Sequence, residues 1–256
     1  MNMYDVLLAK KLGGGTDPSQ GATATAGDIA LGKTAAVNGE MITGTSIYSG
    51  IPDASITGDI VIPNGVTSIK DGAFWQCSNI ENLDIAGSVV TIGEAAFRNC
   101  TKIKSITLHE GTTTTGTYCF RGCDQIESFV FPNSLVNIGN DTLRDCTKLK
   151  SVTFSPNLAE IPNYCCTSCA LSYVKIPGSV TRIGMQAFEY NRNLNEIDCT
   201  ELTISNGNVN TTLGNNAFRY TSSSVRIVFA DEATMNVYAA ANNWSTYASK
   251  MTYVGA

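Results

Sequence analysis

The sequence predicts a β-rich α+β solenoid of about seven 23-residue coils, closed by an N-terminal hairpin cap and a C-terminal helical cap. Three observations lead to this prediction. A large apolar residue recurs every 23 residues, further apolar columns follow it in the same phase, and so do five cysteines: Cys77, Cys100, Cys123, Cys146 and Cys169. Columns that keep one phase indicate stacked copies of a single unit, because each copy must bury its apolar face against its neighbours.

Each unit contains a segment that predicts a strand. The segment Ile80-x-x-Leu83-x-Ile85 ends in period-two alternation, so Leu83 and Ile85 share the inward face. Stacked copies would place these strands about 4.8 Å apart in a parallel sheet. The residues between the inward ones then point outward and form the candidate binding residues of an open sheet face: Asn82, Asp84, Ser105, Thr107, Ser128, Ser151, Thr153, Tyr173, Lys175, Glu196 and Asp198.

The cysteine and phenylalanine columns are predicted to form ladders inside the solenoid. Cysteine is a small buried hydrophobe that donates weakly to backbone carbonyls, and asparagine can take the same turn position with hydrogen bonds. Five equivalent thiols cannot all pair, and a disulfide needs specific geometry, so free thiols are favoured. The predicted interior residues are the five cysteines above with Asn191, and Phe74, Phe97, Phe120, Phe188 and Phe218.

These residues carry a family resemblance. The pattern Ile-Pro-x-x-Val-Thr-x-Ile-x-x-x-Ala-Phe-x-x-Cys-x-x-Ile-x-x-Leu-x-Ile, from Ile62 to Ile85, resembles the BspA-type leucine-rich repeat. It recurs from Ile176 to Cys199 after a one-residue slip in register, with Asn191 in the cysteine place. The resemblance covers about residues 51–229 and implies a leucine-rich-repeat solenoid. It also implies kinship with bacterial, protozoan and viral surface proteins implicated in adhesion to host or matrix proteins.

The N-terminal segment has a different composition. Residues 1–16 are expected to hold a short helix, from Tyr4 to Leu12, and a glycine linker; residues 17–50 are expected to hold a short helix and a hairpin at Asn38-Gly39. Both resemble a module of phage and prophage tail proteins, which implies attachment to other tail or surface proteins. The alternative is that this segment only caps the first coil, whose edge would otherwise be exposed.

The C-terminal segment follows repeats that are expected to fill residues 51–229. A seventh, degenerate unit arrives late, because a loop is inserted at residues 200–212. Residues 230–256 are predicted to form a cap, with an amphipathic helix over 233–249 and a short strand over 251–254.

No catalytic residue, metal ligand set or cofactor is predicted. The single histidine, His109, has no partner that the sequence can nominate, and Cys166-x-x-Cys169 lacks the second pair of a zinc site. The net charge of −5 and the scattered basic residues argue against a nucleic-acid partner. No apolar run is long enough for membrane insertion, and no signal peptide is visible.

The function expected from the sequence is non-enzymatic recognition. The sheet would be presented to a host-surface protein or glycan, with the chain forming part of a phage or prophage tail in a virion. The alternative is an exported bacterial adhesin at the cell surface. A third hypothesis is a glycan-active tail enzyme, whose two carboxylates would come from Asp84, Glu196 and Asp198.

Overall fold

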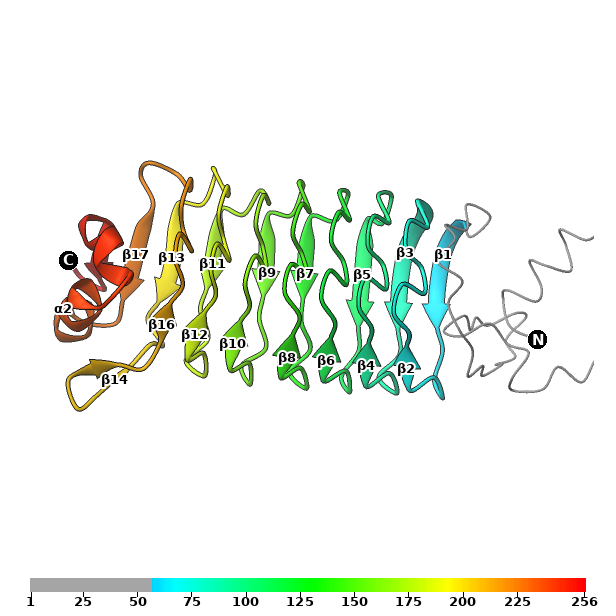
Figure 1. Ribbon diagram of the computed structural model, residues 1–256, viewed down its shortest axis with the longest axis horizontal. Helices are drawn as coiled ribbons and strands as arrows, with labels where there is room; N and C mark the ends of the chain where they lie inside the picture. The colour runs from blue at the N-terminus through cyan, green and yellow to red at the C-terminus, as the bar shows by residue number, and fades with distance from the viewer. Residues whose placement is uncertain (1–56) are drawn as a thin grey trace, which may run out of the picture.

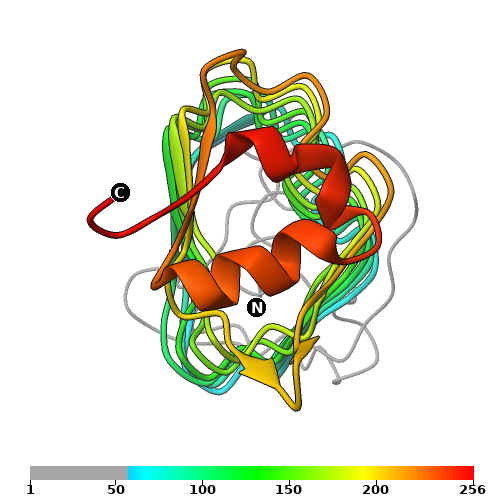
Figure 2. The ribbon, with the colours of Figure 1, turned by 90° about the vertical axis from the view of Figure 1, so that its left-hand side faces the viewer.

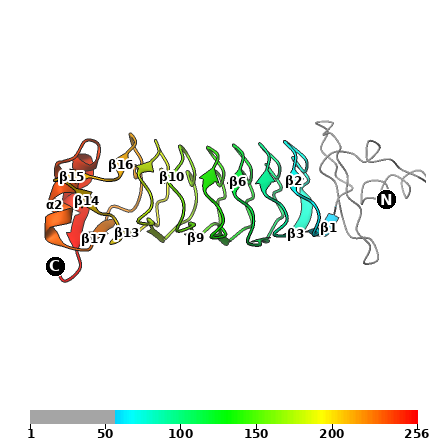
Figure 3. The same cartoon turned by 90° about the horizontal axis from the view of Figure 1, so that it is seen from below.

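The computed structural model describes residues 57–256, so the expected N-terminal helices, linker and hairpin lie outside the described residues. Within residues 57–256 the chain is a solenoid whose coils stack along one axis (Figure 1). The leucine-rich-repeat solenoid predicted from the 23-residue period is confirmed. Two rows of strands run along opposite sides of the stack, as Figure 3 shows.

The main sheet contains the longer strands, and all of its pairs are parallel. Residues pair with the equivalent residue of the next coil, as Leu83 does with Ile106 and Val174 with Ile197. Its hydrogen-bonded groups are β1-β3-β5, β7-β9 and β11-β13-β17-β18. The strands are β1 (Thr57–Ile62), β3 (Asn79–Ile85), β5 (Ser105–Leu108), β7 (Ser128–Val130), β9 (Ser151–Thr153), β11 (Tyr173–Lys175), β13 (Glu196–Cys199), β17 (Arg226–Phe229) and β18 (Met251–Tyr253).

The opposite wall is built from two-residue strands, again parallel. Glycine follows several of them because the preceding coil leaves no room for a side chain. A Cβ atom on Gly116 would lie 2.4 Å from the backbone nitrogen of Glu94. The strands form the groups β2-β4-β6-β8 and β10-β12-β16: β2 (Ser68–Ile69), β4 (Thr91–Ile92), β6 (Thr114–Thr115), β8 (Asn137–Ile138), β10 (Glu160–Ile161), β12 (Arg182–Ile183) and β16 (Thr212–Leu213).

The turn that follows each short strand contains two left-handed residues four positions apart, which the sequence did not indicate. Ala95 (φ 52°) and Asn99 (φ 59°) are one such pair. Both donate their N–H to the next coil, to the carbonyls of Thr117 (2.8 Å) and Arg121 (2.7 Å). These hydrogen bonds between coils offset the cost of a left-handed conformation in residues other than glycine.

The phenylalanine and cysteine columns predicted from the 23-residue period lie in the interior. Phe74, Phe97 and Phe120 stack with ring centroids 4.9 and 5.5 Å apart. Leucine and cysteine take the next two places of the column, and phenylalanines from the main sheet continue the aromatic contacts there: Phe129, Phe131 and Phe154. All nine cysteines are buried.

The C-terminal segment differs from the single helix expected over 233–249. The helix α2 (Glu232–Ala240) ends early, and a separate 3-10 helix, η1 (Trp244–Lys250), begins after Asn243, which adopts a positive φ of 62°. The Asn243 side chain donates to the carbonyl of Leu213 (2.6 Å), which anchors this break to the last short strand. Tyr238 and Trp244 pack on Phe229, and α2 crosses the end of the coil stack (Figure 2).

The inserted loop at residues 200–212 contains a small antiparallel hairpin. Its strands are β14 (Ile204–Ser205) and β15 (Asn208–Val209). Asn206 and Gly207 connect them, and both have positive φ, 51° and 75°. Two positive φ values in a two-residue hairpin loop are typical of a type I′ turn, and Asn-Gly is its preferred sequence.

Candidate binding face

The candidate binding residues lie on the outer side of the main sheet. On β9, for example, Ser151 and Thr153 are exposed while Val152 is buried, and β11 repeats this pattern with Tyr173 and Lys175 around a buried residue. Because consecutive strand residues point to opposite faces, the strands place these side chains in two columns that run along the coil stack.

At the N-terminal end of the face, polar side chains are bonded to one another. The Ser105 hydroxyl donates to the amide oxygen of Asn82 (2.6 Å), and the Asn82 amide donates to Asp59 (2.6 Å). Asp84, in the other column, lies 2.8 Å from the His109 ring nitrogen. These groups therefore satisfy one another across neighbouring coils.

A row of charged pairs borders the face. Lys104 contacts Glu81 at 2.7 Å and Lys150 contacts Glu127 at 2.8 Å, each across one coil. The hydrogen bond from Lys150 lowers the pKa of Glu127. All four side chains are about half exposed or more, so the pairs act mainly on the register of neighbouring strands and add little to stability.

The outward side chains change in size at the junction of β9 and β11. The small Ser151 and Thr153 lie next to the large Tyr173 and Lys175, and the step between them forms a pocket of about 370 Å³. The other lining residues come from β9, from the turns after β9 and β11, and from the turn after β13: Val152, Phe154, Pro156, Pro177 and Glu201. We name this cavity the step pocket.

Two polar side chains of the step pocket are held in place. The Lys175 ammonium lies 2.6 Å from one carboxylate oxygen of Glu201, and the other oxygen accepts the N–H of Gly178 (3.0 Å). These two interactions lower the pKa of Glu201, and the first raises the pKa of Lys175. Both groups are therefore charged at neutral pH.

Tyr173 forms one wall of the pocket, and the residue is 44% exposed. Its hydroxyl donates to Asp198 (2.7 Å). Partial burial and this hydrogen bond raise the pKa of Tyr173 to about 12. Burial works to raise the pKa of Asp198, but hydrogen bonds from Thr200 and Tyr173 outweigh it, and the net pKa is lowered.

Glu196 and Asp198 lie two residues apart on the outer face of β13, but both are engaged by other groups. Glu196 is bonded to Arg226 (2.6 Å), and Asp198 is already the acceptor of three hydrogen bonds. Asp84 lies on β3, with four strands of the main sheet between it and β13, which is well beyond the spacing of about 5–9.5 Å that glycosidases need. A lowered pKa at Asp198 also opposes a role as general acid.

The cysteines offer no reactive thiol. Burial raises the pKa of seven thiols above the usual value, so they are protonated at neutral pH: Cys100, Cys119, Cys123, Cys146, Cys166, Cys169 and Cys199. In residues 57–256 no three potential metal ligands gather at one place. No helix in that same range is long and apolar enough to span a bilayer.

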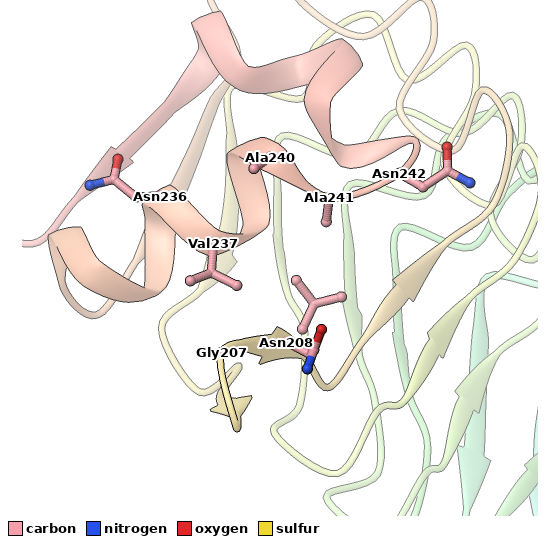
Figure 4. A pocket seen from close by; sticks show the side chains of 8 residues that line it. Gly207, Asn208, Asn236, Val237, Ala240, Ala241 and Asn242 are labelled. Atoms are coloured by element: carbon pink, nitrogen blue, oxygen red, sulfur yellow. The ribbon is translucent and has the colours of Figure 1, made fainter.

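A second, more open pocket of about 680 Å³ lies between the β14–β15 hairpin and α2 (Figure 4). Val237 of α2 and Ala241, which directly follows α2, face it from one side and Asn208 of the hairpin from the other. Its lining carries no charged side chain. This pocket is at the end of the stack and is lined in part by the inserted segment at residues 200–212.

Sequence reasoning missed several residues of the step pocket. Glu201 stands 23 residues after Gly178, in the turn that follows β13, so the repeat places it beside the pocket, but the sequence does not indicate its pairing with Lys175. Pro156 stands one position later than the proline of the preceding coil, Pro132, so the column pattern did not include it. A usable signal was present, because the outward column changes abruptly from Ser151 to Tyr173.

Comparisons with known proteins agree with this geometry. A family model described as the BspA type Leucine rich repeat region matches in six copies, over residues 67–195 and 113–246. No curated protein matches the chain significantly.

Several solved structures are similar. A leucine rich cell surface protein from Faecalibacterium prausnitzii A2-165 is 22% identical over 57% of this chain and 51% of its own, with a TM-score of 0.43. A leucine-rich repeat protein from T. pallidum is 24% identical over 66% of this chain and 73% of its own, with a TM-score of 0.41. One from Bacteroides ovatus is 18% identical over 67% and 63%, with a TM-score of 0.34. The chain spans about half the length of the first of these.

Proposed function

Because this chain belongs to the BspA-type leucine-rich-repeat family, we propose that it is a non-enzymatic recognition protein that binds a host-surface protein or glycan through the outer face of its main sheet. The observation that supports the proposal most is the change along this face. Small hydroxyl side chains in the middle give way to Tyr173 and its charged neighbours on β11 and β13. Exposed tyrosine flanked by polar groups is a composition that binding surfaces favour.

A binding experiment with matched variants tests this proposal. The full chain would be applied to host cells and to immobilised matrix proteins. One variant carries Thr107→Arg and Thr153→Arg on the main sheet, and its control carries Thr91→Arg and Thr181→Arg on the opposite wall, where both threonines are also exposed. Loss of binding only in the main-sheet variant is expected. Equal binding by both variants would contradict the proposed face.

The setting of this recognition has two candidates. The resemblance of residues 4–45 to phage and prophage tail proteins supports a tail component carried in a virion, attached through that segment to other tail proteins. The second candidate is an exported surface adhesin. Genomic neighbourhood separates them, because a gene among tail and baseplate genes supports the first, whereas an isolated gene with an export signal upstream supports the second.

The glycan-active enzyme remains testable beside recognition. Its carboxylates are engaged with Arg226 and with neutral donors. Turnover of cell-wall or capsular polysaccharide that disappears in Glu196→Gln or Asp198→Asn would overturn the non-enzymatic proposal.

A further inference from the structure

We infer that the step pocket binds one uncharged pyranose ring of a glycan, packed against Tyr173 and hydrogen-bonded by Ser151, Thr153, Lys175 and Glu201. This inference rests on the proposed function and narrows it to a ligand class and to one junction of the face. The pocket volume of about 370 Å³ is at the lower end of the range for small-molecule sites, which suits a sugar unit rather than a large ligand.

The apolar part of the pocket has the shape that a sugar ring requires. Ser151 is the coil-to-coil neighbour of Tyr173, and its small side chain leaves the side of the tyrosine that faces β9 uncovered. Buried Val152 and Phe154 lie at the base. A pyranose has one face of C–H groups, which can pack on an aromatic ring and remove apolar surface of both partners from water.

The polar part of the pocket offers both donors and acceptors. Within residues 57–256, the hydroxyls of Ser151 and Thr153 make no hydrogen bond to protein, so they are available as donors and acceptors. The Lys175 ammonium has three N–H donors and directs one to Glu201, while the Glu201 carboxylate keeps further acceptor sites. Because the ion pair and the Gly178 N–H hold Glu201 in place, little side-chain entropy is lost on binding.

The charges around the pocket favour a sugar without net charge. Lys175 and Glu201 neutralise each other, as do Arg226 and Glu196 on the next coils. Asp198 is bonded only to neutral donors, so one negative charge is left beside the Tyr173 hydroxyl. An acidic sugar would be repelled by this charge.

An extended peptide is a poorer occupant. A peptide that adds to a sheet needs an exposed strand edge, and β9 and β11 lie side by side inside the coil stack, so their main-chain groups point along the stack and not toward the pocket. Pro156 and Pro177 at the rim have no N–H to offer. The polar groups that line the pocket are therefore side-chain groups, which match hydroxyls better than a peptide backbone.

The test uses the full chain and a matched pair of variants. Ser151→Trp fills the pocket, and Thr91→Trp places the same side chain on the opposite wall, outside the pocket. Both residues are exposed, so both variants should fold. The chains are applied to an array of neutral and acidic glycans, and binding of the best neutral saccharide is measured by calorimetry.

The expected result is binding of neutral glycans, weakened at least about tenfold by Ser151→Trp and unchanged by Thr91→Trp. Binding to host cells or matrix proteins without any glycan binding would overturn this inference and leave the proposed function standing. Glycan binding that both variants retain, or that prefers acidic sugars, would also overturn it. Absence of binding to cells, proteins and glycans alike would overturn the proposed function as well.

Discussion

Replacing Asn191 by cysteine should destabilise the protein, although cysteine is the residue that the repeat pattern favours there. The buried Asn191 side chain donates to the carbonyls of Cys166 (2.7 Å) and Phe188 (2.9 Å), and its oxygen accepts the N–H of Leu171 (3.1 Å). A thiol can reproduce the first bond, as Cys100 does with the carbonyl of its own preceding coil (3.0 Å). It cannot replace the acceptor for Leu171.

The need for this acceptor comes from the one-residue slip in register. In the preceding coil, Leu149 donates its N–H to the carbonyl of Cys146, three residues earlier (3.0 Å). Only Ala170 separates Cys169 from Leu171, so this turn cannot form and the Leu171 N–H depends on Asn191. The shortened turn removes the usual acceptor of the Leu171 N–H, and the asparagine supplies another.

The magnitude follows from the hydrogen bonds lost. A buried N–H without a partner costs about 1–3 kcal/mol, and the weakened contact at the Phe188 carbonyl adds about 0.5–1.5 kcal/mol. Asn191→Cys should therefore lower the free energy of unfolding by about 2–4 kcal/mol. Urea unfolding measures this loss, and hydrogen exchange at the Leu171 amide shows whether the predicted group is the one exposed.

The same substitution in a variant with the regular turn spacing tests the link between the slip and Asn191. Replacing Ala170 by Thr-Lys restores the spacing of Thr147-Lys148, so that the Leu171 N–H can bond to Cys169. In that background Asn191→Cys should lower the free energy of unfolding by no more than about 1 kcal/mol. Equal losses in the two backgrounds, or unchanged exchange at Leu171, would refute the link between the slip and the asparagine.

Three further outcomes are expected. Gly116→Ala should lower the free energy of unfolding by about 3 kcal/mol or more, because the added Cβ would lie 2.4 Å from the Glu94 nitrogen. Thermal unfolding measures this loss, and a melting temperature lowered by only a few degrees would contradict the close packing of the coils. No thiol should react with a thiol reagent in the folded chain, and all nine should react after unfolding. Reaction in the folded state would show that the cysteine ladder is accessible. The pKa of Asp198 is lowered in the folded state, so its carboxylate stabilises the fold above the unfolded pKa of about 3.9 and loses this effect as the pH falls through the folded pKa. The stability gap between the native chain and Asp198→Asn should be constant from pH 7 to 5 and close below pH 4, and a gap that persists at pH 2 would contradict this role.

The sequence was sufficient for the solenoid because burial has a period. Every apolar residue that faces inward on β3, β9 or β11 belongs to a column visible at 23-residue spacing. The left-handed turns were not visible, because residues as different as Ala95, Tyr118 and Asp141 occupy the equivalent position. Their conformation is set by hydrogen bonds between coils and not by local preference.

The inserted hairpin could have been predicted, because Asn206-Gly207 is the same type I′ signal that indicated a hairpin at Asn38-Gly39. The step pocket could be predicted only in part. The change from Ser151 to Tyr173 is evident in the outward column, and Glu201 stands 23 residues after Gly178 in the turn column. The ion pair between Lys175 and Glu201 joins residues from two different columns, so the period alone does not reveal it.

The slip in register joins the core to the binding face. Leu171, whose N–H Asn191 holds, precedes Tyr173 by two residues, so the same hydrogen bond orients the start of β11. At this junction β9 and β11 lie in different hydrogen-bonded groups of the main sheet, and it is here that the step pocket opens. The shortened coil is accommodated in the core by an asparagine that replaces a cysteine, and the same coil begins the part of the face where Tyr173 follows the row of small hydroxyl side chains.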